Sequence, residues 1–336
     1  MKNGIYTLAN DYVYNQLVAL LNSIEVNGGA NIPVCVIAYN DQIEKVRAEV
    51  EKRPNVTLFN DPDIFARWEE FSLKVWESHP KAIQNWREQG ITTKFYRVGE
   101  NRRYCAFDLD SNFEKFIYLD ADTLVMQPLD FIFDQLDHHD FVVYDFQYKD
   151  PSHIYNLSSP KLIEIFSQER INSEIFCSGF YASKRGMFPP EQRDWIISEL
   201  QSGESDILYM SAPNQSVLNY MRMKNNVSFY NFALNLPTGT ATGNAVSSLH
   251  FENIDQVLYD KGNRLTYLHY IGLSSKLFSK VCNGENIDFP YRDIFLHYRY
   301  LHEPEKRPKF TTKAKAYNAP PSLGTKILRK LGLAKK

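Results

Sequence analysis

Lys115-Phe-Ile-Tyr-Leu-Asp-Ala-Asp-Thr-Leu-Val125 is the stretch that decides how this chain folds. Its first part, Lys115 to Leu119, has the apolar and aromatic residues of a buried strand. That strand delivers the acidic segment Asp120-Ala121-Asp122 to its carboxyl end. Ligands of open α/β sheets bind at this end of the strands, so we expect a binding site around the two aspartates.

The first 60 residues predict the sheet to which this strand belongs. The expected strands are Ile5–Leu8, Val34–Ala38 and Val56–Phe59, and the expected helices run from the caps Asn10 and Asp11 to Gly28 and Gly29, and over residues 41–52. This β-α-β-α-β order predicts parallel strands with helices packed on the sheet.

The remainder of the chain has a mixed pattern. Residues 62–110 are expected to be mainly helical, Phe141–Tyr144 and Ile175–Ala182 to be strands, and residues 206–222 to be a helix. The predicted fold class is therefore α/β, with a Rossmann-like mixed sheet flanked by helices. We expect one domain over residues 1–302 and a tail rich in Pro, Lys and Arg over residues 303–336.

Composition narrows the classes of partner and compartment. A formal net charge of −2 gives no basic face for nucleic acid, and an aromatic share of 14% suits a protein that stacks rings on bases and sugars, although cores also use aromatics. The four cysteines lie far apart without a Cys-x-x-Cys pair, which predicts neither a zinc cluster nor a disulfide framework. With no recognisable signal peptide or membrane span, a cytoplasmic location is expected.

The acidic pair is suited to a divalent cation. Two carboxylates in one turn can both reach one hard cation, and a diphosphate needs such a cation when its bond to a sugar breaks. The simpler alternative is that Asp120 and Asp122 only cap the turn before Leu124.

The same segment also resembles the first motif of haloacid dehalogenase-type phosphatases, in which Asp120 would be a phosphorylated nucleophile. In that superfamily the motif lies on the first strand of the core, whereas here a whole β-α-β-α-β unit precedes it. The chain also has no later Gly-Asp-x-x-x-Asp pair to complete the metal site. The phosphatase is therefore the weaker alternative.

Five separated features together resemble the nucleotide-sugar transferases of glycosyltransferase family 8, the group of glycogenin and the bacterial lipopolysaccharide galactosyltransferases. They are Thr7-Leu-Ala-Asn-Asp-Tyr-Val-Tyr14, Arg103 on an expected helix, Ile117–Val125, Phe176-Cys-Ser-Gly-Phe180 and Leu268-His-Tyr-Ile-Gly272. The resemblance covers about residues 4–280 and is most specific at the acidic segment. It implies a GT-A-type fold and a metal-dependent transfer of a sugar, with a UDP-sugar as donor and with retained configuration.

The resemblance also implies roles for individual residues. The metal, Mn²⁺ or Mg²⁺, would be bound by Asp120, Asp122 and His269, a plausible ligand set for manganese. Asn214 and Gln215 would face the transferred sugar as catalytic residues. The nucleotide-sugar would be held by Leu8, Ala9, Asn10, Tyr14, Arg103, Ala121, Ser178, Gly272 and Lys276, with Tyr14 stacking on the base.

The chain departs from the family at three places. Cys177 replaces an asparagine, and Lys276 is the nearest cation where the family has Lys-Pro-Trp after its His-Tyr-x-Gly motif. Asn214 replaces the usual aspartate; it can bind sugar hydroxyls but carries no charge to stabilise an oxocarbenium ion. A nucleotide-sugar-binding protein without catalytic activity therefore stays open as a second alternative.

The tail combines an apolar face with positive charge. Leu323, Ile327, Leu328 and Leu331 share a face at helical spacing, and lysines and an arginine flank it. This pattern is typical of a peripheral membrane anchor at the inner membrane surface, but it also fits a solvated chain end. The expected partners are a nucleotide-diphosphate sugar, a glycan, lipid or protein acceptor, and possible membrane contact through the tail.

Overall fold

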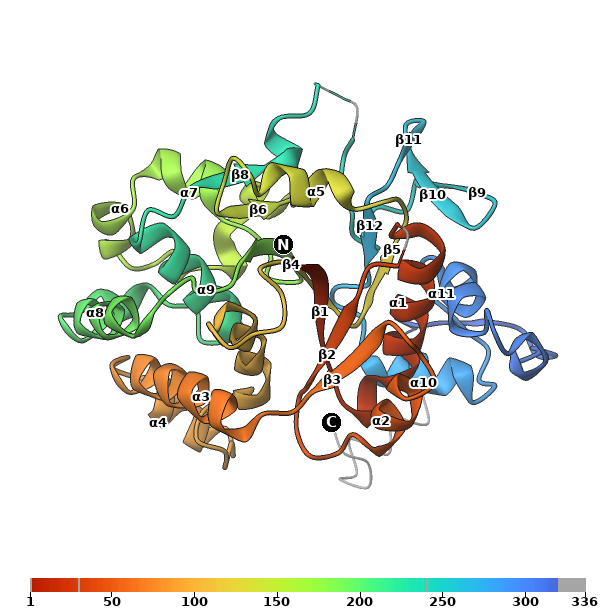
Figure 1. The fold of residues 1–336 in the computed structure, drawn as a ribbon, viewed down its shortest axis with the longest axis horizontal. Helices are drawn as coiled ribbons and strands as arrows, with labels where there is room; N and C mark the ends of the chain where they lie inside the picture. The colour runs from red at the N-terminus through yellow and green to blue at the C-terminus, as the bar shows by residue number, and fades with distance from the viewer. Residues whose placement is uncertain (1, 30, 238, 240, 320–336) are drawn as a thin grey trace.

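A mixed seven-stranded sheet forms the centre of the computed structural model, which describes residues 2–29, 31–237, 239 and 241–319 (Figure 1). The strand order is β3-β2-β1-β4-β7-β6-β8. Their bounds are β1 Asn3–Ala9, β2 Val34–Ala38, β3 Val56–Phe59, β4 Lys115–Asp120, β6 Phe141–Val143, β7 Phe180–Lys184 and β8 Phe229–Asn231. Strands β1 to β4 are parallel, and β7 is antiparallel to both β4 and β6. The predicted mixed α/β sheet is confirmed.

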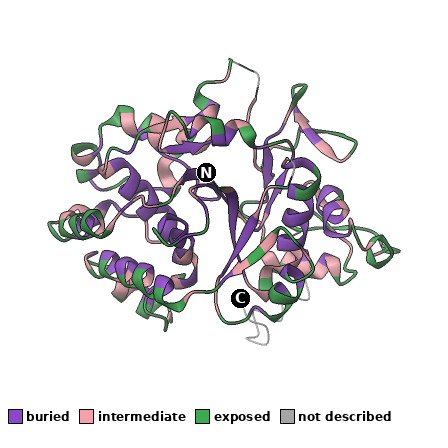
Figure 2. Ribbon diagram, in the orientation of Figure 1, coloured by how far each residue is buried: buried purple, intermediate pink, exposed green. Residues whose placement is uncertain are grey.

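Register within the parallel part brings the expected site together. β1 lies between β2 and β4, and Leu8 is paired with Asp120. The residues that follow β1 and β4 therefore meet at one edge of the sheet. Figure 2 shows the central strands almost entirely buried, which agrees with their nearly continuous apolar sequences.

Helices cover both sides of the sheet. Figure 1 shows α1 (Tyr14–Asn27), α2 (Glu44–Val50), α10 (Ser275–Cys282) and α11 (Arg292–Arg299) on one side. On the other side it shows α3 (Pro62–Glu77), α4 (Ala82–Glu88), α8 (Pro190–Gln201) and α9 (Pro213–Lys224). The shorter elements include α5 (Asp130–Gln135), α6 (Lys161–Ile165), α7 (Gln168–Glu174), and the 3-10 segments η1 (Asp11–Val13), η2 (Val98–Phe107) and η5 (Glu204–Ile207).

Two predicted elements begin later than expected. The strand predicted from Ile175 starts only at Phe180, because the preceding backbone N–H groups bond to side chains instead of a neighbouring strand. Phe176 N donates to Asn219, and Cys177 N donates to Asp145. The helix predicted from residue 206 starts at Pro213, a residue that fits the first helical turn because its missing N–H needs no partner there.

A small two-stranded sheet connects the distant C-terminal part to the acidic segment. β5 (Thr123–Val125) pairs antiparallel with β12 (Tyr267–His269), and this places His269 opposite Thr123. The flanking hairpin contains β9 (Glu252–Ile254), β10 (Val257–Asp260) and β11 (Asn263–Arg264). A residue that lies about 150 positions downstream in sequence is thus carried to the end of β4.

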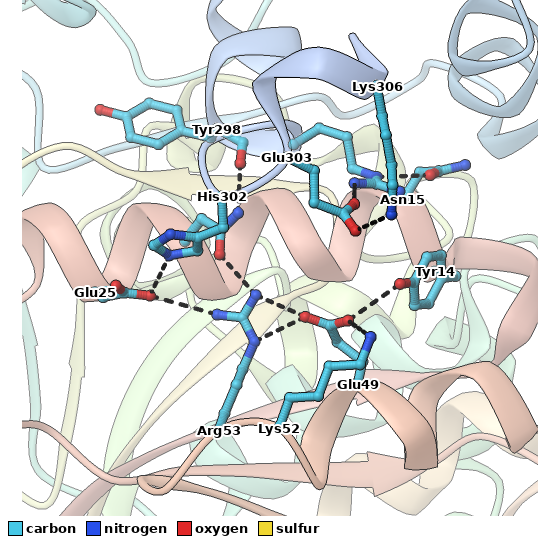
Figure 3. A network of polar contacts seen from close by, with 12 residues as sticks. Tyr14, Asn15, Glu25, Glu49, Lys52, Arg53, Tyr298, His302, Glu303 and Lys306 are labelled. Atoms are coloured by element: carbon cyan, nitrogen blue, oxygen red, sulfur yellow. Dashed lines mark hydrogen bonds and ion pairs between the residues drawn. The ribbon is translucent and has the colours of Figure 1, made fainter.

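The C-terminal part is also fastened to α1 and α2. Figure 3 shows Arg53 between Glu25 and Glu49, with distances of 3.6 Å and 2.8 Å between the charged atoms. His302 Nε2 lies 3.0 Å from the same Glu25. Further on, β14 (Lys315–Ala316) pairs with β13 (Ile287–Asp288).

None of the helices in the described part of the chain combines the length and apolar character needed to cross a bilayer. The membrane-anchor hypothesis concerns residues 320–336, which lie outside the described residues.

Candidate active site

A cleft of about 1260 Å³ opens at the carboxyl ends of β1 and β4, where the sequence predicts a site. Its walls come from the loop after β1, from η2, from the acidic segment, and from the loops before β7 and after β12. The predicted residues that line it are Leu8, Ala9, Asn10, Arg103, Asp120, Ala121, Asp122, Ser178, Asn214, Gln215, His269 and Gly272. The fold therefore gathers all of the predicted site residues except Tyr14 and Lys276.

Asp120, Asp122 and His269 form a group that could hold a metal ion. One ligand atom from each lies within 4.8 Å of the others. His269 Nε2 is 3.3 Å from Asp122 Oδ1. The imidazole fits because residue 179 is glycine: a Cβ there would lie 2.3 Å from His269 Cε1 and 3.1 Å from Asp120 Oδ2. Gly179 thus gives the metal group its space.

Asp120 is oriented by two neighbours on one oxygen. Arg103 Nη2 lies 3.1 Å from Asp120 Oδ1, and the Tyr118 hydroxyl donates to the same oxygen at 2.9 Å. Arg103 is only 4% exposed, and its Nη1 also donates to the Ser178 carbonyl at 2.9 Å. Because Oδ2 lies on the side of Gly179, it can bind a cation without breaking either contact.

Asp122 and His269 shift the pKa of one another in opposite directions. Burial alone would lower the pKa of His269, but the adjacent Asp122 raises this pKa well above its ordinary value. Burial would likewise raise the pKa of Asp122, but His269 holds it below its usual range. A cation bound by these two side chains would displace the proton of His269, because an imidazole binds a metal in its deprotonated form.

Asn214 and Gln215 lie in the first turn of α9 and contact the segment before β7. Ser178 is the common partner: its hydroxyl donates to Asn214 Oδ1 and its backbone N–H donates to Gln215 Oε1, both at 3.0 Å. Gln215 Nε2 donates to the His153 carbonyl at 3.0 Å. The two amide side chains are thus fixed in the wall of the cleft.

Glu100, Asp145 and Asp150 are cleft carboxylates that were not predicted from the sequence, and the first two are buried among named partners. Glu100 accepts a hydrogen bond from Asn214 Nδ2, and its pKa is raised by burial and by the carboxylates of Asp120 and Asp122. Asp145 accepts N–H groups from Gln147 at 2.8 Å and Cys177 at 3.0 Å, and burial raises its pKa to about 6. A usable signal existed for Asp145, because it follows an apolar strand as the acidic pair does.

Tyr14, whose ring the sequence predicts to stack on a base, does not line the cleft. Its hydroxyl donates to Glu49 at 3.1 Å (Figure 3), and its ring lies 5.5 Å from the guanidinium of Arg299. The 3-10 turn η1 precedes α1 and directs Tyr14 toward α2 and the C-terminal part. Tyr12 and Tyr39 line the cleft instead.

Lys276 does not line the cleft either. It is exposed in the first turn of α10, beside Ser274 and Ser275, which do line the cleft. A helix directs successive side chains about 100° apart, so a neighbouring position does not share the orientation of Ser275. The role of Lys276 in holding the nucleotide-sugar stays a prediction.

Comparisons with known proteins find one matching protein family and several solved structures with a similar fold. A model of the family described as "Mannosyltransferase putative" matches residues 2–232. No curated protein is a significant match to the chain.

Solved structures similar to this one include the apo form of mouse xyloside xylosyltransferase 1, with a TM-score of 0.50, 9% identity, and coverage of 69% of this chain and 85% of that one. The galactosyltransferase LgtC in complex with donor and acceptor sugar analogues aligns with a TM-score of 0.49, 14% identity, and coverage of 83% and 94%. Core-mannan synthase A from Aspergillus fumigatus, in its Mn/GDP form, aligns with a TM-score of 0.41, 13% identity, and coverage of 69% and 73%.

Proposed function

This chain belongs to the mannosyltransferase family whose model covers residues 2–232, and we propose that it transfers a mannosyl group from a nucleoside-diphosphate sugar to an acceptor hydroxyl. Its family and its fold make it a glycosyltransferase of the GT-A type, the class of enzyme that the sequence predicts. The family assignment rules out the phosphatase alternative built on Asp120. Mannosyl transfer is more specific than the transfer of an unidentified sugar that the sequence leads us to expect.

The observation that carries the proposal is the position of the metal group in the cleft. Asp120, Asp122 and His269 bring two carboxylates and one imidazole to the carboxyl ends of the parallel strands. An imidazole ligand suits Mn²⁺ better than Mg²⁺, which prefers oxygen ligands and retains several waters. A bound cation would neutralise the diphosphate and stabilise the leaving nucleotide.

The residues around the metal group orient the donor. Arg103 fixes Asp120 from the buried side, and the loop with Gly272 and Ser275 lines the cleft beside His269. Tyr12 and Tyr39 offer rings to the base, and Tyr12 is 58% exposed. Ring stacking accepts guanine and uracil alike, so these rings do not distinguish a GDP-sugar from a UDP-sugar. The proposal therefore specifies the mannosyl group and the metal, and the identity of the base has to be determined by experiment.

The proposed transfer needs no covalent bond between the enzyme and the sugar. The bond between the anomeric carbon and the diphosphate oxygen breaks, and its electron pair leaves with the nucleoside diphosphate. An acceptor hydroxyl oxygen forms the new bond to the same carbon, and its proton passes to the departing phosphate oxygen. This proton acceptor lies on the face from which the diphosphate leaves, so attack from that face retains the anomeric configuration.

Donor hydrolysis without acceptor tests the proposal. The full-length protein is incubated with GDP-mannose, UDP-glucose or UDP-galactose, with Mn²⁺ or with chelator, and release of the free sugar and the nucleoside diphosphate is measured. We expect Mn²⁺-dependent release of mannose that Asp122→Ala abolishes. Binding of a nucleotide without turnover of any donor would instead support the non-catalytic binder and overturn the transfer proposal.

A further inference from the structure

Glu100 and Asn214 form a carboxylate–amide pair in the wall of the cleft. Glu100 Oε2 accepts a hydrogen bond from Asn214 Nδ2, and the two residues are 114 positions apart in sequence. The other oxygen of Glu100 lies 2.9 Å from Arg97 Nε, and the Glu100 side chain is 16% exposed. Both residues line the cleft. The carboxyl group of Glu100 is thus held at a fixed point between the Arg97 guanidinium and the Asn214 amide.

The amide of Asn214 is oriented so that it can only donate to Glu100. Its Oδ1 accepts from the Ser178 hydroxyl at 3.0 Å, which leaves Nδ2 for the carboxylate. The Asn214 backbone is fixed as well, because its carbonyl accepts from the buried Tyr104 hydroxyl at 2.6 Å. On the other side, Arg97 adopts a left-handed backbone with φ of 59°, a conformation that costs free energy for a residue with a side chain.

A chain of contacts fixes this pair relative to the metal group. The Ser178 hydroxyl that donates to Asn214 accepts from Arg103 Nη1 at 3.1 Å. The other terminal nitrogen of Arg103 lies 3.1 Å from Asp120 Oδ1. Glu100, Asn214, Asp120 and Asp122 line the same cleft, so a sugar attached to a diphosphate at the metal group would share this cleft with the Glu100 carboxylate.

We propose that Glu100 supplies the negative charge that stabilises the transferred sugar in the transition state, with Asn214 as the residue that positions it. The inference rests on the proposed function. Positive charge develops on the anomeric carbon as the electron pair of the breaking bond leaves with the diphosphate. A preoriented carboxylate stabilises that charge without itself forming a bond. Asn214 is uncharged, so the charge expected at its position comes from its partner.

Exchange of the two side chains separates this role from a structural one. Glu100→Gln removes the charge and keeps the shape, Asn214→Asp places a second carboxylate against the first, and the double variant returns one carboxylate and one amide in reversed positions. We expect kcat for donor turnover to fall about 100-fold in Glu100→Gln, the size of effect produced when one charge-stabilising group is lost. The double variant should recover at least tenfold over Glu100→Gln.

A matched control is available in Glu69. Its side chain is also 16% exposed and also lies 2.9 Å from an arginine, Arg102, but it lies outside the cleft with the metal group. Glu69→Gln should keep the wild-type kcat. All variants should bind the nucleoside diphosphate and Mn²⁺ with wild-type affinity in calorimetry, which shows that the site is folded.

Each remaining result has a defined meaning. An active wild type whose Glu100→Gln variant keeps kcat within about threefold overturns the inference alone. Loss of activity in Glu100→Gln without recovery in the double variant, although both bind nucleotide, shows a structural role and also overturns it. A wild type that binds nucleotide but turns over no donor overturns the proposed function and this inference with it.

Discussion

Gly179→Ala should weaken Mn²⁺ binding without direct removal of a ligand. The new Cβ would lie 2.3 Å from His269 Cε1, 3.0 Å from Nδ1 and 3.1 Å from Asp120 Oδ2. Ordinary carbon–carbon contacts are about 3.5–4.0 Å, so the imidazole has to move by roughly 1 Å or more. His269 is 6% exposed on β12, which leaves it little free space.

That displacement is large for a metal site, where ligand distances are set to about 0.2 Å. We expect Mn²⁺ affinity to fall about 10- to 100-fold, the range for changes that reorient a ligand. Isothermal titration of Mn²⁺ into wild type and Gly179→Ala, in the presence of nucleoside diphosphate, measures it. Wild-type affinity in a folded Gly179→Ala protein would refute the assigned geometry.

Gly4→Ala is the matched control for this experiment. A Cβ at Gly4, in β1, would lie 2.4 Å from the ring of Phe113, a clash of similar size away from the cleft. Both variants should lose about 1–3 kcal/mol of unfolding free energy from overpacking. Only Gly179→Ala should lose metal affinity, and equal losses of affinity in both would indicate a general effect of instability.

Three further predictions concern charge. Mn²⁺ binding near pH 7 should release about one proton, because the raised pKa of His269 keeps this side chain protonated without metal. Calorimetric titrations in two buffers of different ionisation enthalpy measure the number of protons released. An Mn²⁺ affinity that does not weaken as the pH falls would contradict the prediction. Arg103→Ala should cost about 3 kcal/mol in urea unfolding, because it leaves Asp120 without its buried cation, and a loss below about 1 kcal/mol would argue against that pairing. Protonated Asp145, with its pKa raised to about 6, contributes stability that is present below about pH 4 and is lost as the pH rises to about 6. Asp145→Asn should remove this loss, which is worth up to about 3 kcal/mol. The prediction is wrong if the melting temperatures of Asp145→Asn and wild type change equally over that pH range.

Sequence patterns predict those features that depend on neighbours along the chain. Val34–Ala38 and Val56–Phe59 are strands with the predicted bounds, since each is a short apolar run between polar turns. The acidic pair also lies at the predicted place, at the carboxyl end of β4. The position of Tyr14 could not be predicted in this way. The direction of its side chain depends on the 3-10 turn η1, which the helical spacing of α1 does not reveal. Glu100 differs because its partner Asn214 is 114 residues away, and only tertiary packing brings the two together.

The metal group depends on a part of the chain that the family match does not reach. The matched residues 2–232 contain Asp120 and Asp122, but His269 lies beyond them. The third ligand arrives only because β12 pairs with β5, which directly follows Asp122. Two further bonds hold this arrangement on α1: Asn27 Nδ2 donates to the Val125 carbonyl at 3.0 Å and to the Tyr298 hydroxyl at 2.8 Å.

This dependence makes packing of the C-terminal part a condition for metal binding. Asn27→Leu keeps the approximate side-chain size but removes both bonds, and it also removes the bond from Arg264 Nη2 to Asn27 Oδ1 at 2.9 Å. Asn27 lies outside the cleft, so a loss of Mn²⁺ affinity would result from a changed position of β5 and β12. Leaving the Val125 carbonyl unpaired in a buried position costs about 1–3 kcal/mol. We expect Asn27→Leu to weaken Mn²⁺ binding together with this loss of stability, whereas Asn85→Leu, on α4 away from β12, should leave Mn²⁺ binding unchanged. If Asn27→Leu binds Mn²⁺ as tightly as wild type does, the β5–β12 pairing positions His269 without help from α1.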